Sequence, residues 1–203
     1  MDFFKPLHIE SFEKQRSEPK VGIKFLILLI ILAASTVVSG FALDFNALTA
    51  EQSNIQGVDS EQLATYTKYF SLIGIVIGAL FALGFMFLVL FIIDKISKSE
   101  TRPKSIFASL LLRVIIIQLI QLVAITIQWI VGIDATQYSI TSLNVFDPDN
   151  DALRAISLTT LVSAWLFGVT LHSTMHINKR WSLILTFIYL LLFMGLPLIF
   201  ALI

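Results

Sequence analysis

The sequence of 203 residues contains no cysteine and few charged residues. The absence of cysteine excludes a disulfide-stabilised scaffold and a thiolate metal site. Only 14% of the residues are charged, against about 25% in soluble domains, and the net charge is zero. Sparse and balanced charge excludes binding of nucleic acid through bulk positive charge, and it excludes a disordered acidic or basic tail.

The sequence also lacks the short motifs of common catalytic sites. It contains no P-loop, no Gly-x-Ser-x-Gly and no Rossmann glycine run. The polar segments between its apolar runs are too short to fold a catalytic domain, and the interiors of those runs hold almost no acid–base pair. We therefore expect a protein that is not an enzyme and that needs no cofactor.

Apolar residues are present in excess, at 57% of the sequence, against about 45–50% in soluble domains. The mean hydropathy of +0.87 exceeds what a soluble chain of this length can bury. A helix needs about 20 apolar residues to cross the hydrocarbon core of a bilayer. Five apolar runs of that length predict an all-α, polytopic membrane bundle with five transmembrane helices. These runs cover about 22–43, 69–93, 106–132, 155–177 and 181–202.

The polar segments divide the chain into a leader, residues 1–20, and a transmembrane domain, residues 21–203, with outer loops at 44–68 and 134–153. In the leader, four apolar side chains alternate with charged ones, which favours an amphipathic segment in the headgroup layer. These are Phe3, Phe4, Leu7 and Phe12. A disordered leader with incidental aromatic residues is the alternative. Asp59 or Ser60 is positioned to cap the N-terminus of a helix that continues into the second span.

The distribution of charge predicts the orientation of the chain. Eleven cations lie in the leader and first turn, between the second and third spans, and after the fourth: Lys5, Lys14, Arg16, Lys20, Lys24, Lys95, Lys98, Arg102, Lys104, Lys179 and Arg180. The outer loops are acidic instead: Asp44, Glu51, Asp59, Glu61, Asp134, Asp147, Asp149 and Asp151. Because cytoplasmic loops carry an excess of Lys and Arg, we expect the N-terminus in the cytoplasm and the C-terminus outside.

The third predicted helix has a polar face. Arg113, Gln118, Gln121 and Gln128 fall within an arc of about 140° at about 100° per residue. Polar residues within a membrane usually face the bundle interior or water, so these four are candidate lipid- or substrate-facing residues. Two interpretations stay open for Arg113: an interfacial anchor that reaches phosphates or a buried functional charge. The glutamines either bond neighbouring helices or line a transport path.

Two other helices carry stripes of small residues at helical spacing. The second has Gly74, Gly78 and Ala82, and the fourth has Thr160, Ala164 and Gly168. Such stripes let helix backbones approach closely within lipid. We expect them to pack helices, with a substrate path between the two helices as the alternative.

His172 and His176 have the spacing with which two imidazoles share a metal ion. The residues between them are Ser173, Thr174 and Met175, so the glutamate of a zinc protease is absent, and no third ligand is evident. We expect no metal site and interpret the pair as interfacial histidines.

The order of features resembles bacterial members of the Yip1 family. The motifs that carry the resemblance are Phe3-Phe4-x-Pro6, Phe12 and Glu18-Pro19, then Leu143-Asn144-Val145-Phe146-Asp147-Pro148, a span with Trp165 and Gly168, and Asn178-Lys179-Arg180-Trp181. The resemblance covers nearly the whole chain and implies a five-span integral protein of the bacterial cytoplasmic membrane. The long cytosolic N-terminal region of eukaryotic members is missing, which leaves Rab-type GTPase binding without support.

The resemblance implies a non-catalytic scaffold or accessory factor for other membrane proteins, in transport or envelope homeostasis. The expected partners are the lipid bilayer and other membrane proteins, or a second copy of the chain, but no nucleic acid. The alternative hypothesis is a small transporter or lipid-handling protein that uses the polar face of the third helix.

Overall fold

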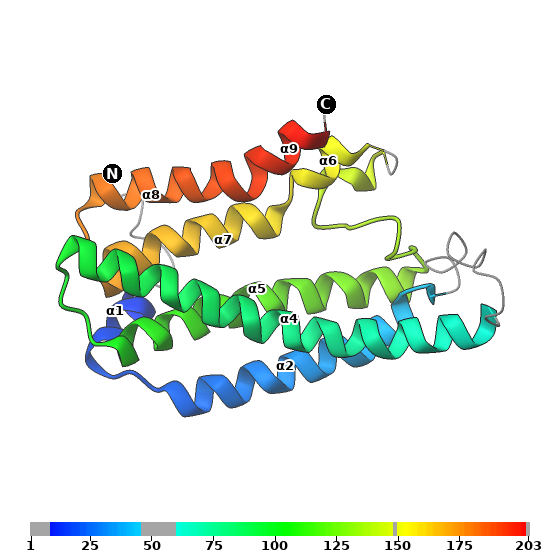
Figure 1. Ribbon diagram of the computed structural model, residues 1–203, viewed down its shortest axis with the longest axis horizontal. Coiled ribbons are helices and arrows are strands. Elements are labelled where there is room, and N and C mark those ends of the chain that lie inside the picture. The colour runs from blue at the N-terminus through cyan, green and yellow to red at the C-terminus, as the bar shows by residue number, and fades with distance from the viewer. Residues whose placement is uncertain (1–8, 46–59, 148–149, 202–203) are drawn as a thin grey trace.

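The computed structural model describes residues 9–45, 60–147 and 150–201, and Figure 1 shows their arrangement. This part of the chain is helical and contains no strand, apart from an isolated bridge between Ser142 and Ser157. The long helices run side by side along the longest axis of the molecule. The predicted all-α fold is confirmed for these residues.

Four helical segments among the described residues are long and apolar enough to cross a membrane. Each is rich in Leu, Ile, Val and Phe, and each covers one of the predicted runs. They are α2 (Val21–Ala42), α4 (Ser60–Ser97), α5 (Pro103–Val131) and the continuous unit of α8 (Lys179–Leu190), the π-helical η3 (Leu191–Gly195) and α9 (Leu196–Ala201).

The fourth predicted run, 155–177, forms a shorter helix than expected. α7 (Leu158–Val169) continues as the π-helix η2 (Thr170–Thr174) and ends there. The chain then turns, and His176 adopts a left-handed conformation with φ 55°. Length and composition therefore identify four spanning helices in the described part of the chain, and the five-span count is not confirmed.

The described part of the leader packs against the bundle. α1 (Ile9–Ser17) places Phe12, which is fully buried, against Leu166 and Val169 of α7. The Thr174 hydroxyl donates a hydrogen bond to the Phe12 carbonyl at 3.0 Å. The leader is thus held by protein contacts, whereas the predicted Phe3, Phe4 and Leu7 lie outside the described residues.

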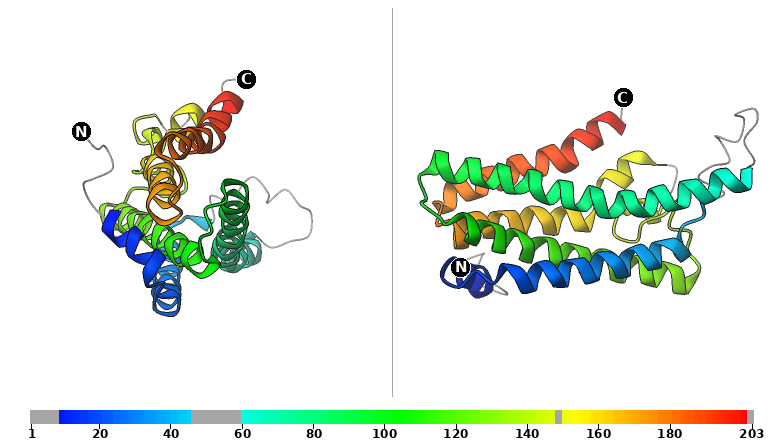
Figure 2. Two further views of the ribbon diagram at one scale, coloured as in Figure 1. Left: turned by 90° about the vertical axis from the view of Figure 1, so that its left-hand side faces the viewer. Right: turned by 60° about the horizontal axis from the view of Figure 1, so that its bottom comes forward.

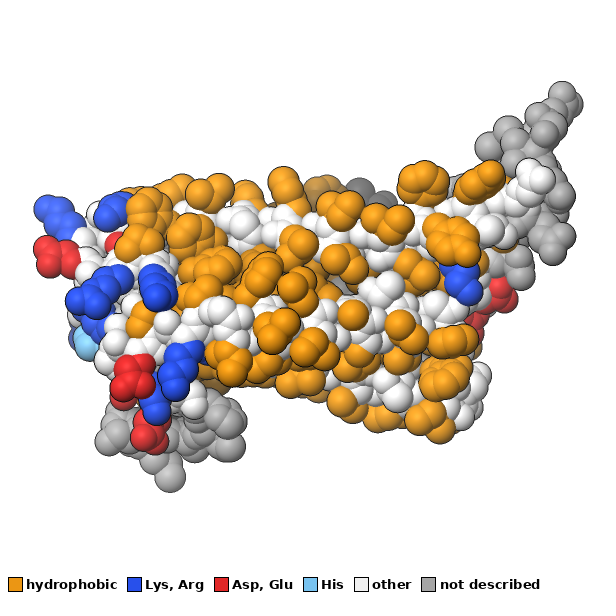
Figure 3. Space-filling view, turned by 90° about the horizontal axis from the view of Figure 1, so that it is seen from below, with side chains coloured by type: hydrophobic (Ala, Val, Ile, Leu, Met, Phe, Trp, Pro, Cys, Tyr) orange, Lys and Arg blue, Asp and Glu red, His pale blue; other side chains and the backbone are white. Residues whose placement is uncertain are grey.

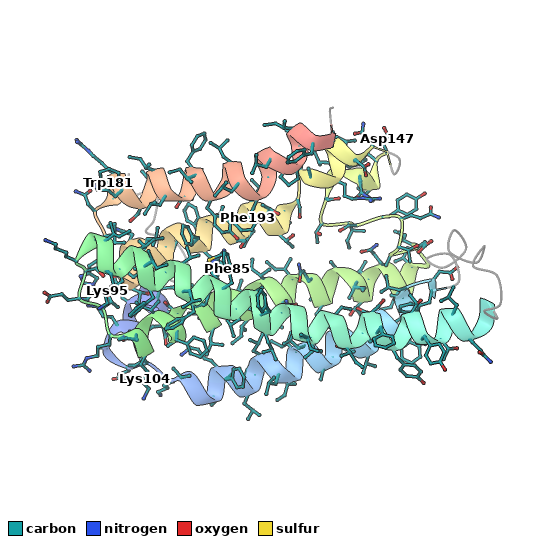
Figure 4. All side chains as sticks on the ribbon, in the orientation of Figure 1. Phe85, Lys95, Lys104, Asp147, Trp181 and Phe193 are labelled. Atoms are coloured by element: carbon teal, nitrogen blue, oxygen red, sulfur yellow. The ribbon has the colours of Figure 1, made fainter. Side chains whose placement is uncertain are left out.

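Charged side chains gather at the ends of the molecule, with an apolar band between them (Figure 3). One end, which we call the basic end, holds α1, the α4–α5 connection and the α7–α8 turn (Figure 1). Figure 4 places Lys95, Lys104 and Trp181 there and Asp147 at the opposite end. Trp129 lies in the last turn of α5, toward the opposite end, and is half exposed. Tryptophans near both ends match the aromatic belts of membrane proteins.

The core lies between α2, α4, α5 and α7, and it is built from aliphatic side chains. Leu28, Leu32, Leu90, Leu110 and Leu171 are at most 1% exposed and belong to a single cluster. Large apolar residues on the outer faces of the helices are exposed instead. This inside–outside pattern is expected where lipid, which is as apolar as leucine, surrounds the bundle.

At the opposite end, the segment after α5 is irregular and contains only η1 (Leu143–Val145) and α6 (Asp151–Ala155). α5 ends at Gly132, which takes a left-handed φ of 74°. Asn144 is 1% exposed and holds the segment together. Its amide donates to the Gln137 carbonyl at 3.1 Å and accepts from the Ser139 backbone at 3.2 Å.

Candidate functional site

Arg113 lies deep within the bundle. It is ten residues beyond Pro103, about 15 Å along α5, and Tyr189 is equally far from Lys179 along α8. Both therefore lie near the middle of a hydrocarbon core of about 30 Å. The Arg113 side chain is 3% exposed. This position favours the buried interpretation of Arg113, because an interfacial anchor would reach the surface.

The guanidinium of Arg113 joins three helices. Its Nη2 donates to the Ser163 hydroxyl of α7 and to the Tyr189 hydroxyl of α8, both at 2.7 Å. These two hydroxyls are themselves 3.0 Å apart. The guanidinium also lies over the ring of Tyr189, 4.9 Å from its centroid, which is a cation–π distance.

The ring of Phe167, stacked on that of Tyr189, lies 5.4 Å from the guanidinium of Arg113. Within the described residues, no carboxylate forms an ion pair with Arg113. Hydroxyl groups and aromatic rings therefore stabilise the charge, and the geometry makes Arg113 a cross-link between α5, α7 and α8.

The three glutamines lie elsewhere, on the wall of a cavity of about 260 Å³ between α2, α5 and the segment that follows α5. Arg113 does not line this cavity. The polar side chains on its wall are Ser35, Ser39, Gln118, Gln121, Gln128, Tyr138, Ser139 and Thr141, and the others are Ile75, Ala124, Ile125 and Ala135. The structure thus divides the predicted polar face into two sites.

Several polar groups on the cavity wall have no hydrogen-bond partner. The Ser35 hydroxyl is buried and unpaired. The amides of Gln118 and Gln121 make no hydrogen bond to any residue that the structure describes. Gln128, by contrast, is 4% exposed and donates to the Tyr138 carbonyl at 3.0 Å. A buried polar group without a partner is costly, so the buried Ser35 hydroxyl, with the two free amides beside it on the same wall, indicates a place for water or a ligand.

The two stripes of small residues differ in their surroundings. A Cβ atom added at Gly168 would lie too close to the hydroxyl of Thr186 and only 3.5 Å from the Cβ of Thr186. The absence of a side chain at Gly168 therefore allows α7 and α8 to approach each other. At Gly74 and Gly78 a Cβ would meet nothing within 4 Å, and Ala82 is exposed. Only the stripe on α4 is therefore open to the surroundings.

The remaining residues of the α7 stripe also face inward. Ala164 is 3% exposed, and Thr160, one turn further from the basic end, is half buried. Gly168 and Ala164 of this stripe are therefore covered by the protein itself.

The predicted histidine pair does not share a helix face. His172 lies in η2, and its Nδ1 is 3.1 Å from the Ile177 carbonyl, whereas His176 lies beyond the helix and is exposed. In the described part of the chain, no group of three His, Cys, Asp or Glu side chains is placed to hold a metal ion. The helical spacing on which the candidate metal pair depended is lost where η2 ends.

Three further polar residues form hydrogen bonds in the bundle, and the predicted polar face of α5 does not include them. Ser163 and Tyr189 are polar positions within apolar runs, and that isolation is the signal that points to them. Asp94 is 1% exposed and accepts bonds from the Ser99 hydroxyl and the Thr101 backbone N–H. Its carboxylate therefore fixes the α4–α5 connection and is not free for catalysis.

Comparison with known proteins gives one informative similarity. The chain is 29% identical over 180 residues to "Membrane protein YknW" of Bacillus subtilis, a match that covers 84% of this chain and 76% of that protein. The chain is an integral membrane protein. No protein-family model and no solved structure matches it. The similarity agrees with the four apolar helices, which make the chain a multi-pass protein.

Proposed function

We propose that the chain is a non-catalytic, Yip1-like scaffold or accessory factor that binds another membrane protein through α4. We further propose five spans, with the N-terminus in the cytoplasm and the C-terminus outside. Figure 1 supports this topology, because α7 leads the chain back to the basic end and α8–α9 leads it away again. α7 and η2 together have 17 residues, which is at the lower limit of about 17 for a spanning helix. The excess of cations at the basic end supports a cytoplasmic location for that end.

The open stripe on α4 is the observation that carries the proposal. Gly74, Gly78 and Ala82 lie on one face of the helix, and no side chain of the described residues covers either glycine. Exposed bulky residues such as Ile77 and Phe81 lie beside the stripe. In Figure 2, α4 stands at the side of the bundle, apart from α7 and α8. A stripe of small residues beside bulky ones is a surface against which a second transmembrane helix can pack closely.

The test places a photoreactive amino acid at Ala82 in living cells. We expect a discrete protein adduct that falls severalfold in the Gly78→Leu variant, because a leucine on the stripe holds the partner helix away from the α4 backbone. Gly84→Leu is the matched control, since Gly84 is equally uncovered but lies on another face of α4. Adducts to lipid alone, or equal adducts in both variants, would contradict the proposal.

The cavity favours a second candidate function, the handling of a lipid or small solute along the glutamine face of α5. The unpaired groups on its wall support this, but Arg113 does not take part because its guanidinium is enclosed by α7 and α8. Proteoliposomes that contain the chain should then move a lipid or solute faster than empty vesicles. Equal flux in the two preparations would argue against this function.

A further inference from the structure

Ser35 and Gln118 of the cavity wall lie at a similar depth, and the cavity leads from there toward one end of the bundle. Ser35 is fourteen residues beyond Val21 and Gln118 is fifteen beyond Pro103, so both are about 21–22 Å from the start of their helices. The segment with Tyr138 and Ser139 lines the same cavity at the end opposite the basic end. The cavity thus extends from beyond the middle of the bundle to its outer rim.

The chemistry of the described part of the wall disfavours a charged ligand. Among the residues that the structure describes, no Asp, Glu, Lys or Arg lines the cavity, and a charge placed in a site without a counter-charge is disfavoured. Arg113, the cation on the same helix, is already held by Ser163 and Tyr189. An anionic headgroup would therefore find no cationic partner among the described residues of this cavity.

The same wall also disfavours a purely apolar ligand. Amide side chains donate and accept hydrogen bonds, and so do hydroxyl groups. An apolar ligand would leave the buried Ser35 hydroxyl unpaired, which is unfavourable, and it would cover the amides of Gln118 and Gln121 without bonding them. A ligand with several hydroxyl groups would satisfy all three, because each hydroxyl both donates and accepts.

The rest of the wall suits the carbon skeleton of such a ligand. Tyr138 supplies an aromatic ring, and Ile75 and Ile125 supply apolar surface. A volume of about 260 Å³ lies just below the range of about 300–1,000 Å³ found for sites of drug-sized ligands. The space therefore fits a single sugar ring or a glycerol unit and not an oligosaccharide.

We infer that the cavity binds an uncharged polyol, either as the headgroup of a neutral lipid or as a free solute. This inference rests on the second candidate function and adds the class of ligand. Gln118, Gln121 and Ser35 would bond the hydroxyl groups. Gln121 is exposed on the wall, so the cavity is open on that side, where the acyl chains of a lipid headgroup would leave it.

The experiment measures lipid retention by native mass spectrometry, with the full chain in detergent micelles. The probes are glucosyl diacylglycerol, phosphatidylglycerol and free methyl glucoside. We expect one bound glucosyl diacylglycerol, with a Kd about tenfold higher in the Gln118→Leu/Gln121→Leu double variant, because two hydrogen bonds of about 0.5–1.5 kcal/mol are lost. Thr126→Val is the matched control, since this hydroxyl bonds its own helix at the Leu122 carbonyl and does not line the cavity.

The single Gln121→Leu variant guards against misfolding, because this exposed amide has no partner among the described residues and leucine there removes no contact. Displacement of the glycolipid by methyl glucoside would show that a free solute is sufficient to occupy the cavity. Failure to displace it would show that the ligand is the headgroup of a lipid. Both results support the inference. No retained glycolipid, equal retention in the double variant, or stronger retention of phosphatidylglycerol would overturn it.

The flux measurement tests the candidate function separately. Binding without flux would leave the polyol site intact and remove the transport role. Flux of another solute without binding of either glucoside would support the transport role and contradict the polyol site.

Discussion

α5 carries two polar regions that differ in how their groups are satisfied. In the region nearer the basic end, the charged Arg113 has hydroxyl partners at 2.7 Å and aromatic rings beside it. In the outer region, the neutral amides of Gln118 and Gln121 have no partner among the described residues and face a cavity. The charged guanidinium of Arg113 is thus enclosed by the protein, whereas the neutral amides of Gln118 and Gln121 are available to bind a ligand or water.

This difference shows that charge alone does not locate function in a membrane bundle. An ionisable residue within the membrane is a functional candidate by default, yet a buried group that bonds side chains of two neighbouring helices acts as a structural link. An unpaired neutral group can still exchange its partner with a ligand or water. Three measurements test this contrast between the two regions of α5.

The largest effect is expected for Arg113→Ala. The change removes two hydrogen bonds and both aromatic contacts, and it leaves a cavity where α5, α7 and α8 meet. Large-to-small changes in a core cost about 2–5 kcal/mol, so we expect a loss of about 3 kcal/mol in the free energy of unfolding. Unfolding in mixed micelles with increasing SDS measures this loss.

Arg113→Met is the control that keeps most of the volume. Methionine fills most of the space of the arginine and removes the cost of burying a charge, and the Ser163 and Tyr189 hydroxyls, 3.0 Å apart, still bond each other. We expect a loss of less than about 1 kcal/mol. If Arg113→Ala were as stable as the unchanged chain, Arg113 would not be a structural link.

A smaller effect is expected for Tyr189→Phe. The hydroxyl that accepts from Arg113 is lost, but the ring that lies over the guanidinium stays. The Ser163 hydroxyl remains as an acceptor, so we expect a loss of about 1 kcal/mol, the usual net value of one hydrogen bond. The same SDS titration applies. A loss as large as that of Arg113→Ala would show that the tyrosine, and not the arginine, holds the three helices together.

Much of the fold is predictable because lipid imposes a simple length rule. The long apolar runs become α2, α4, α5 and the α8–α9 unit, since each has enough residues to cross the hydrocarbon core. The fourth run departs from this rule at its end, where Met175 and His176 leave the helix. That turn depends on tertiary contacts of η2, such as the bond from Thr174 to Phe12 of α1. Hydropathy does not report such contacts.

The candidate site is predictable only in part, because periodicity gives the direction of a side chain and not its neighbour. The arc from Arg113 to Gln118 is about 140° wide, which is broad enough to face α7 and α8 at one edge and α2 at the other. Gly78 and Gly168 show the same limit. They occur in similar stripes, yet Thr186 closes only the space around Gly168.

The smallest effect on stability is expected for Gln118→Leu. The amide has no partner among the described residues, so leucine removes no bond within that part of the protein and adds apolar surface beside Ala124 and Ile125. We expect a change within about 0.5 kcal/mol, as for substitutions away from structural contacts. The SDS titration gives this value, and Thr126→Val provides the reference. A loss near that of Arg113→Ala would mean that Gln118 also joins helices, and the contrast between the two regions of α5 would then fail.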